Sequence, residues 1–187
     1  MYHYVGPAEV LAAARPLAPA RAVLAREDIP GADEPFTFVI DLDGTLRLAP
    51  RRSEHVACAG GMPVLSAGEI AFEQGPDGPE VTSVTNQSTG YCPESGSWPA
   101  VAAALDRIAV PHPGRFTDEF TFRRCPGCGE RNLVRDGDFT CAICDVELPA
   151  AWNFGSVGQR GQLASASELA GPALHGRFRC WPVCPVQ

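Results

Sequence analysis

Four cysteines with a regular spacing could together hold one metal ion. The run CPGCGERNLVRDGDFTCAIC contains two C-x-x-C pairs separated by 12 residues. Thiolate sulfur is a preferred ligand of Zn²⁺, and two such pairs can supply the four ligands of one tetrahedral ion. The pattern therefore predicts a Zn²⁺ cofactor bound by Cys125, Cys128, Cys141 and Cys144.

The predicted metal site is closed, because protein atoms supply all four ligands. A catalytic zinc keeps one position for water or substrate, whereas a four-cysteine zinc stabilises the fold. Asp136-Gly137 lies between the two pairs, where a hairpin would join them. Two disulfides in a secreted protein are the alternative, but the N-terminal run MYHYVGPAEV lacks the basic start and apolar stretch of a signal peptide. We therefore expect a zinc ribbon in a reducing cytoplasm.

A second stretch, FVIDLDGTL, has the residue types for Mg²⁺-dependent phosphate chemistry. It resembles the first motif of the haloacid dehalogenase-like phosphatases, which implies Asp41 as nucleophile and Asp43 as general acid. Against this, the chain has no lysine, which the third motif of that family supplies, and the residues after Thr45 alternate as in a strand. A β-hairpin that turns at Asp43-Gly44 is the favoured interpretation, and the phosphatase is our third hypothesis.

A broader resemblance covers residues 36–110. Its motifs are E-H-x-x-C-A-G-G at 54–61, P-V-L-S-A-G-E-I at 63–70 and N-Q-S-T-G-Y-C-P at 86–93, followed by a helix. This portion resembles the conserved domain of plant IQ-motif calmodulin-binding proteins, and the whole chain resembles bacterial proteins that join this domain to a C-terminal zinc ribbon. The chain has Gly90 where that family has His, and it has no IQ motif, so calmodulin binding is not carried over. The resemblance implies a domain without a settled activity, and the matching positions are His55, Gly60, Gly61, Ala67, Gly68, Tyr91 and Pro93.

Polar side chains of these motifs fall in loops and at strand ends, where they could converge on one pocket. Their types suit general acid–base chemistry or the recognition of a small or nucleotide-like ligand. The alternative is that His55 and Tyr91 satisfy buried backbone groups beside glycine-shaped turns. The sequence leaves open whether the protein is an enzyme; the candidate catalytic residues are His55, Glu69, Asn86 and Tyr91.

The composition is that of a globular protein with an acidic balance. Hydrophobic residues make up 45% of the chain, and the formal net charge is −7. An acidic chain is a poor binder of nucleic acid, because such binding depends on neutralising phosphates. The absence of lysine excludes Schiff-base chemistry, and no apolar stretch approaches the about 18–20 residues of a membrane span. We expect a protein partner, with a small-molecule ligand as a further possibility, and neither nucleic acid nor membrane.

The periodicity of the apolar residues predicts helices and strands in one chain. We expect N-terminal helices over 7–15 and 20–27, and an amphipathic helix over 97–109 with Ser97 as its N-cap. Alternation predicts strands within 36–48, 63–72 and 81–86, and residues 51–62 are expected to form a loop.

These elements predict an α+β fold with a mainly antiparallel sheet, N-terminal helices, one amphipathic helix and a C-terminal zinc ribbon. The expected divisions are an α+β domain at 1–114, a ribbon at 115–154 and a loosely ordered tail at 155–187. In the tail, Cys180, Cys184 and His175 could form an incomplete second metal site, although an incidental role is favoured. The favoured function is a cytoplasmic binding or regulatory protein with a structural zinc.

Overall fold

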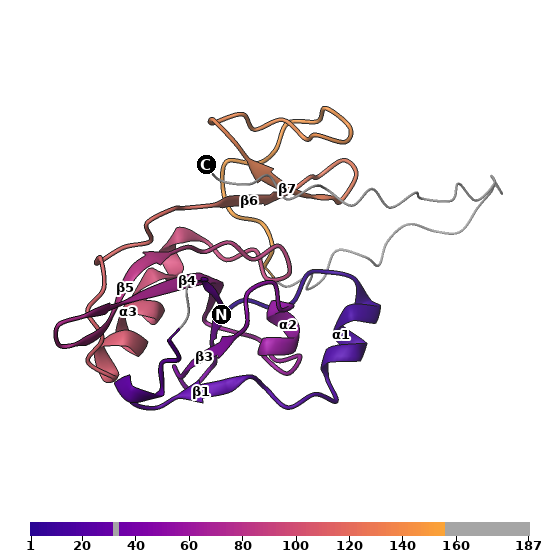
Figure 1. Ribbon diagram of the computed structural model, residues 1–187. Coiled ribbons are helices and arrows are strands. Elements are labelled where there is room, and N and C mark those ends of the chain that lie inside the picture. Colours follow the sequence, from indigo (N-terminus) through magenta and orange to yellow (C-terminus); the bar gives the residue numbers. More distant parts are fainter. Residues whose placement is uncertain (32–33, 156–187) are drawn as a thin grey trace, which may run out of the picture. The chain divides into compact units, whose positions relative to one another are not determined.

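The structure confirms the α+β class. The computed structural model describes residues 1–31 and 34–155, which lie within one compact unit (Figure 1). That unit combines a mainly antiparallel sheet with a few short helices and ends in the cluster of four cysteines. The tail expected at 155–187 and the incomplete site of His175, Cys180 and Cys184 lie outside the described residues, except for Gly155.

A five-stranded sheet forms the centre of the fold. Its strands run in the order β1-β3-β2-β4-β5, and every neighbouring pair is antiparallel. As predicted, β2 and β3 form a hairpin that turns at Asp43-Gly44 and pairs Ile40 with Leu46. The strands are β1 (Arg21–Val23), β2 (Phe36–Ile40), β3 (Leu46–Ala49), β4 (Ser66–Gly75) and β5 (Gly78–Val84).

Strand β2 is buried on both faces. Phe38 and Ile40 face a core shared with α3 (Trp98–Arg107), whereas Val39 faces a second core shared with α1 (Ala8–Ala14) and α2 (His55–Cys58). Figure 1 shows α1 beside α2, apart from α3. Because successive side chains of a strand point to opposite faces, an apolar run such as FTFVI is what a sheet covered on both sides requires.

Helix α3 is the predicted amphipathic helix, and its apolar stripe is buried. Val101 and Leu105 are fully buried against the sheet. Ser97 precedes the helix, but its hydroxyl donates to the Glu94 carbonyl (2.7 Å) instead of capping the helix. Ser97 thus occupies the predicted N-cap position without a capping hydrogen bond from its side chain, and a 3₁₀ turn over Ser95–Ser97 leads into the helix.

Two local predictions are wrong. Residues 20–27 do not form a helix, because Arg21–Val23 pair with β3 as an edge strand and a 3₁₀ turn follows over Arg26–Asp28. Here the Asp28 carboxylate accepts the N–H groups of Leu24 and Ala25 (3.1 Å each). The loop expected at 51–62 contains the single helical turn α2.

The four cysteines lie in a separate segment after α3, residues 121–148, which begins with a β-hairpin and is called the cysteine hairpin below. Strands β6 (Thr121–Arg124) and β7 (Arg131–Val134) pair antiparallel, and the first C-x-x-C pair closes the turn between them. Asp136-Gly137 forms the next turn, beside a bridge between Arg135 and Asp138, as the sequence predicts. Among the described residues, no helix is long and apolar enough to cross a membrane.

Candidate metal centre

The four cysteine sulfurs converge on one point and can hold a metal ion. All four lie within 4.8 Å of one another, with Cys125 and Cys144 3.5 Å apart and Cys128 and Cys141 3.6 Å apart. Four sulfurs at about 2.3 Å from a tetrahedral Zn²⁺ would be about 3.8 Å apart. The observed separations fit a tetrahedral thiolate site with protein sulfur in every position.

Both C-x-x-C pairs sit in the same backbone turn. In the first, the Cys125 N–H donates to the Glu130 carbonyl (2.8 Å), and the Gly129 N–H donates to the Cys125 carbonyl (3.0 Å). In the second, the Cys141 N–H donates to the Val146 carbonyl (2.9 Å), and the Asp145 N–H donates to the Cys141 carbonyl (3.0 Å). The fourth residue after the first cysteine has a positive φ in each turn, +79° at Gly129 and +59° at Asp145. This repeated turn directs the two sulfurs of each pair to the same side.

Amide groups support the negative charge that bound thiolates carry. The Gly127 N–H donates to the Cys125 sulfur (3.3 Å), and the Asn132 side chain donates to the Cys141 sulfur (3.5 Å). At Cys141 desolvation opposes ionisation, but nearby backbone N–H groups, first that of Ile143, and the neighbouring sulfurs outweigh it and lower the thiol pKa to about 6. Hydrogen bonds of this kind orient the side chains that bind a metal and tune their basicity.

Asn86 ties the cysteine hairpin to the sheet. Its side chain is fully buried, and its carbonyl oxygen accepts the Phe120 N–H (2.7 Å). Its amide nitrogen donates to the carbonyls of Phe120 and Pro93 (2.8 Å each). Asn86 was predicted as a catalytic residue; the structure places it just after β5, with its side chain against Phe120, the residue before β6, and these three hydrogen bonds all go to backbone groups.

The chain after the second cysteine pair returns to the contact between the sheet and the hairpin at Asn86, called the joint below. Trp152 donates its indole N–H to the Cys92 carbonyl (2.8 Å) and packs edge-on against Tyr2 (5.4 Å between ring centroids). Asn153 exchanges two hydrogen bonds with the backbone of Arg124 in β6 (2.7 and 2.8 Å). The run NQSTGYCP at 86–93 therefore supplies the surface on which the cysteine hairpin rests, a role that its polar composition did not reveal.

The other candidate catalytic residues are engaged within the domain. The His55 ring is half-buried and its Nε2–H donates to the Gly68 carbonyl (3.0 Å). The Tyr91 ring is fully buried and its hydroxyl donates to the Met62 carbonyl (2.6 Å). Burial lowers the pKa of His55 and raises that of Tyr91. Glu69, partly exposed on β4, pairs with Thr37 of β2.

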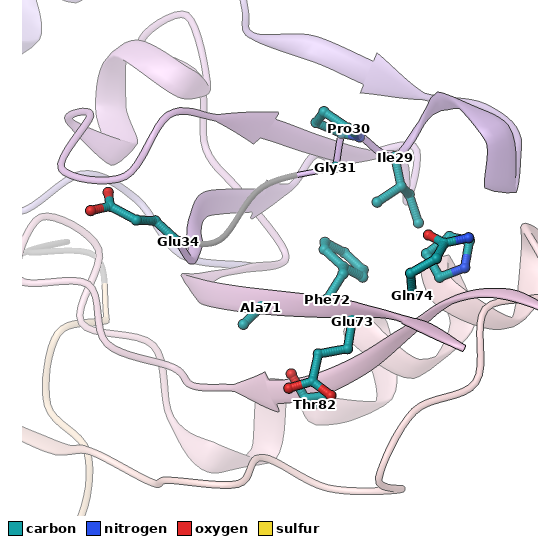
Figure 2. A pocket seen from close by; sticks show the side chains of 10 residues that line it. Ile29, Pro30, Gly31, Glu34, Ala71, Phe72, Glu73, Gln74 and Thr82 are labelled. Carbon is teal, nitrogen blue, oxygen red and sulfur yellow. The ribbon is translucent and has the colours of Figure 1, made fainter. Parts of the chain in front are cut away.

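A cavity in the described part of the chain lies elsewhere. It has a volume of about 580 Å³ and lies between β4, β5 and the segment around Pro30 (Figure 2). None of His55, Glu69, Asn86 and Tyr91 lines it. The structure thus does not bring the four residues to this cavity, and their catalytic role stays a prediction.

The DxDGT run is a hairpin turn. Asp41 accepts the Arg47 guanidinium (2.7 Å) and the Thr45 N–H (2.9 Å), while Asp43 accepts the Thr45 N–H and hydroxyl. The residues after Thr45 form β3, where the phosphatase fold needs a loop and a helix, and the sheet is antiparallel throughout. The phosphatase hypothesis finds no support in this arrangement.

The fold and the site together define an α+β domain that carries a cluster of four cysteines able to hold a metal ion. Comparisons with protein-family models, with curated proteins and with solved structures gave no match to this chain. The resemblance to the domain of IQ-motif proteins is therefore carried by the quoted motifs alone.

Proposed function

We propose that the protein is a cytoplasmic zinc-binding protein that engages a protein partner and whose metal is structural. The observation that carries this proposal is the convergence of four thiols with separations that suit tetrahedral Zn²⁺. Cys125, Cys128, Cys141 and Cys144 would hold the ion, and a reducing compartment would keep them as thiols. Bound zinc would cross-link the two C-x-x-C turns. Because protein sulfur would fill all four positions, the ion would not take part in substrate chemistry.

A structural role follows from what the site holds in place. Cys125, Cys141 and Leu148 form the buried apolar cluster of the hairpin. This cluster contains two of the metal ligands themselves, whereas Phe122 of β6 and Leu133 of β7 pack in a separate cluster with Cys92 and Phe154. In such small modules the free energy of metal binding is the free energy of folding.

A protein partner is favoured over nucleic acid because three of the four arginines of the hairpin, all but Arg135, are engaged by backbone carbonyls. Arg123 donates to the carbonyls of Pro149 and Ala150, Arg124 donates to the Gly129 carbonyl, and Arg131 donates to the Thr89 carbonyl. Guanidinium groups spent on backbone carbonyls do not form the basic surface that phosphate binding needs.

Metal analysis of the purified protein tests this proposal. We expect about one zinc ion per chain, and well under one after Cys128→Ser, which removes an exposed ligand without disturbing a core. Cys58→Ala is the matched control, because Cys58 is buried outside the cluster and its replacement should leave the zinc content unchanged. A wild-type protein purified without chelators that contains no zinc would refute the proposal.

The alternative is an enzyme or ligand-binding protein that uses His55, Glu69, Asn86 and Tyr91. It would require His55 or Tyr91 to exchange its backbone partner for a ligand. Among the described contacts, none favours this exchange.

A further inference from the structure

The four thiols of the metal centre differ in their access to solvent. Cys128 is exposed and Cys144 is partly exposed, whereas Cys125 and Cys141 have only 1% and 0% of their surfaces exposed. The two buried cysteines lie in an apolar cluster with Leu148. A small oxidant in solution therefore reaches the sulfur of Cys128 more readily than the sulfurs of the other three.

Sulfurs of the two C-x-x-C turns lie next to each other across the centre. The Cys128 sulfur is 3.6 Å from that of Cys141, and the Cys125 sulfur is 3.5 Å from that of Cys144. Each of these contacts joins one turn to the other. A disulfide between Cys128 and Cys141 would therefore link the two turns, as a bound metal would, whereas a disulfide within one C-x-x-C pair would not.

Cys58 and Cys92 have a different setting. Both are buried outside the metal centre, and desolvation raises the pKa of each thiol to about 12. They remain protonated at neutral pH, and the thiolate, not the thiol, is the form that reacts with oxidants. These two cysteines are therefore internal controls for any oxidation of the centre.

We propose that the four-cysteine centre is a site of reversible oxidation by peroxides, at which a disulfide between Cys128 and Cys141 replaces the metal as the link between the two turns. Because the reduced centre is taken to hold zinc, this inference rests on the proposed function, and it adds the regulation of that site. Peroxide would be the signal, and release of the metal the response.

The reaction consumes one hydrogen peroxide per disulfide. The Cys128 thiolate attacks one peroxide oxygen; the S–O bond forms as the O–O bond breaks, and the other oxygen leaves as hydroxide. The Cys141 thiolate then attacks the sulfur of this sulfenic acid; the S–S bond forms as the S–O bond breaks, and a second hydroxide leaves. The two sulfurs give up two electrons in total, and two protons from solvent convert the hydroxides to water. The metal keeps only two of its four ligands and is released.

The position of this disulfide decides what happens to the cysteine hairpin. Cys128 and Cys141 are 13 residues apart, and β7 lies in the loop that their disulfide would close. Such closure stabilises a fold mainly by constraining the unfolded chain. Oxidation should therefore release zinc and leave the hairpin folded, whereas chelation of the reduced protein removes the link between the turns altogether.

Hydrogen peroxide, added in equimolar amount to the zinc-loaded full chain, is the probe. Zinc release is followed with a colorimetric chelator, and disulfides are mapped by mass spectrometry after the free thiols have been alkylated. We expect Cys128–Cys141 as the first disulfide, and free thiols at Cys58 and Cys92. A thiol reductant together with added zinc should restore about one zinc ion per chain.

Three products would overturn the proposal. They are a first disulfide within one C-x-x-C pair, a disulfide from the centre to Cys180 or Cys184, and sulfinic acid at Cys128 without any disulfide. This mapping uses the wild-type protein and decides the proposal even if a variant fails to bind zinc.

Histidine substitutions at two equivalent positions form a matched pair of variants. Cys128→His and Cys144→His each replace the last cysteine of one C-x-x-C pair by an imidazole, which also binds zinc. Cys128→His should release zinc at least about tenfold more slowly than the wild type under peroxide, because the exposed thiolate is gone. Cys144→His keeps Cys128 and Cys141 and should release zinc within about twofold of the wild-type rate. Release from Cys128→His at the wild-type rate would refute entry of the oxidant at Cys128.

Zinc content and hydrogen exchange separate the remaining outcomes. A chain that holds no zinc before peroxide is added refutes the proposed function, and with it the exchange of metal for disulfide. Zinc-loaded protein that forms a different disulfide refutes the oxidation site alone. Amide protection in β6 and β7 should persist in the oxidised, metal-free protein. Its loss on oxidation, to the same extent as on chelation, would show that the disulfide does not replace the metal.

Discussion

Two equivalent backbone positions of the metal hairpin are occupied by different residues. Gly129 and Asp145 each follow a C-x-x-C pair, and both have a positive φ. Glycine adopts this conformation freely, whereas a residue with a Cβ does so at a cost, which is moderate for Asp. The second turn is therefore the more strained of the two.

Exchanging the residue types at these positions should change stability in opposite directions. Asp145→Gly should raise the free energy of unfolding of the zinc-loaded protein by up to about 1 kcal/mol, and Gly129→Ala should lower it by about 1–2 kcal/mol. Urea unfolding in the presence of zinc measures both. Asp145→Asn, which removes the charge but keeps the conformation, should have little effect. Destabilisation by Asp145→Gly would contradict the strain assigned to this turn.

His55 should make stability depend on pH. Desolvation holds the pKa of His55 below its unfolded value of 6.5, although the hydrogen bond to the Gly68 carbonyl opposes this shift. Below pH 6.5 the unfolded state therefore binds a proton that the folded state does not, and stability falls as the pH is lowered from about 6.5 to the folded-state pKa. Above pH 7.5 this contribution should no longer change.

Thermal unfolding at pH 5.5 and 7.5 measures this effect. His55→Gln, whose amide can still donate to Gly68, should show a smaller difference in melting temperature between the two pH values than the wild type. Zinc content must be monitored, because protonation of thiolates also releases the metal at low pH. An identical pH dependence of the two proteins at equal zinc content would show that His55 does not contribute.

At the scale of elements, the joint between the sheet and the metal hairpin depends on Asn86. One buried side chain satisfies three backbone groups in two segments that are distant in sequence, Phe120 and Pro93. An amide suits this place because it both donates and accepts, whereas a carboxylate only accepts.

Asn86→Ala should lower the free energy of unfolding by about 2–4 kcal/mol, because it leaves several buried backbone groups without partners. Asn86→Asp should be at least as harmful, since its carboxylate would face two carbonyls. Chemical denaturation measures both variants, and Gln87→Ala, at the exposed neighbour, is the control and should change stability little. A near-neutral Asn86→Ala would mean that the joint is held by Trp152 and Asn153 instead.

The sequence predicted those elements whose signals are local. The β2–β3 hairpin, α3 and the four converging cysteines each follow from a spacing or a turn within about 20 residues. The edge strand at Arg21–Val23 was missed because its pairing with β3 is a tertiary contact that overrides a helical composition.

For His55 and Tyr91 the structure shows the backbone hydrogen bonds that the sequence offered as the alternative, but their partners, and the role of Asn86, were not predictable from local signals. His55, Asn86 and Tyr91 have the residue types of an active site, but their partners are carbonyls of Gly68, Phe120, Pro93 and Met62. A buried polar side chain in a motif needs a hydrogen-bond partner, but only the folded structure shows whether that partner is the protein backbone or a ligand.

At the scale of the whole molecule, the sheet and the metal hairpin have different sources of stability. The sheet has two apolar cores of its own, whereas the two C-x-x-C turns pack around Cys125, Cys141 and Leu148, and β6 and β7 add a small cluster around Phe122. The two parts should therefore respond differently to the loss of metal.

Chelation should unfold the hairpin and leave the sheet folded. Hydrogen exchange before and after treatment with a zinc chelator under reducing conditions should show loss of protection in β6 and β7 and retained protection in β2–β4, because metal binding and folding of the hairpin are coupled. Wild-type protein with added zinc is the control. Loss of protection throughout the chain would show that the joint at Asn86 makes the whole unit depend on the metal.

The four thiols differ in how far solvent can reach them, and this bears on the kinetics of the metal. Cys125 and Cys141 are buried, Cys144 is partly exposed and Cys128 is exposed. A competing thiol ligand in solution would displace Cys128 first and pull the ion outward past it, so exchange of the metal would proceed in ordered steps from one side. The turn that contains the exposed Cys128 would then be the route by which the metal ion enters and leaves the site.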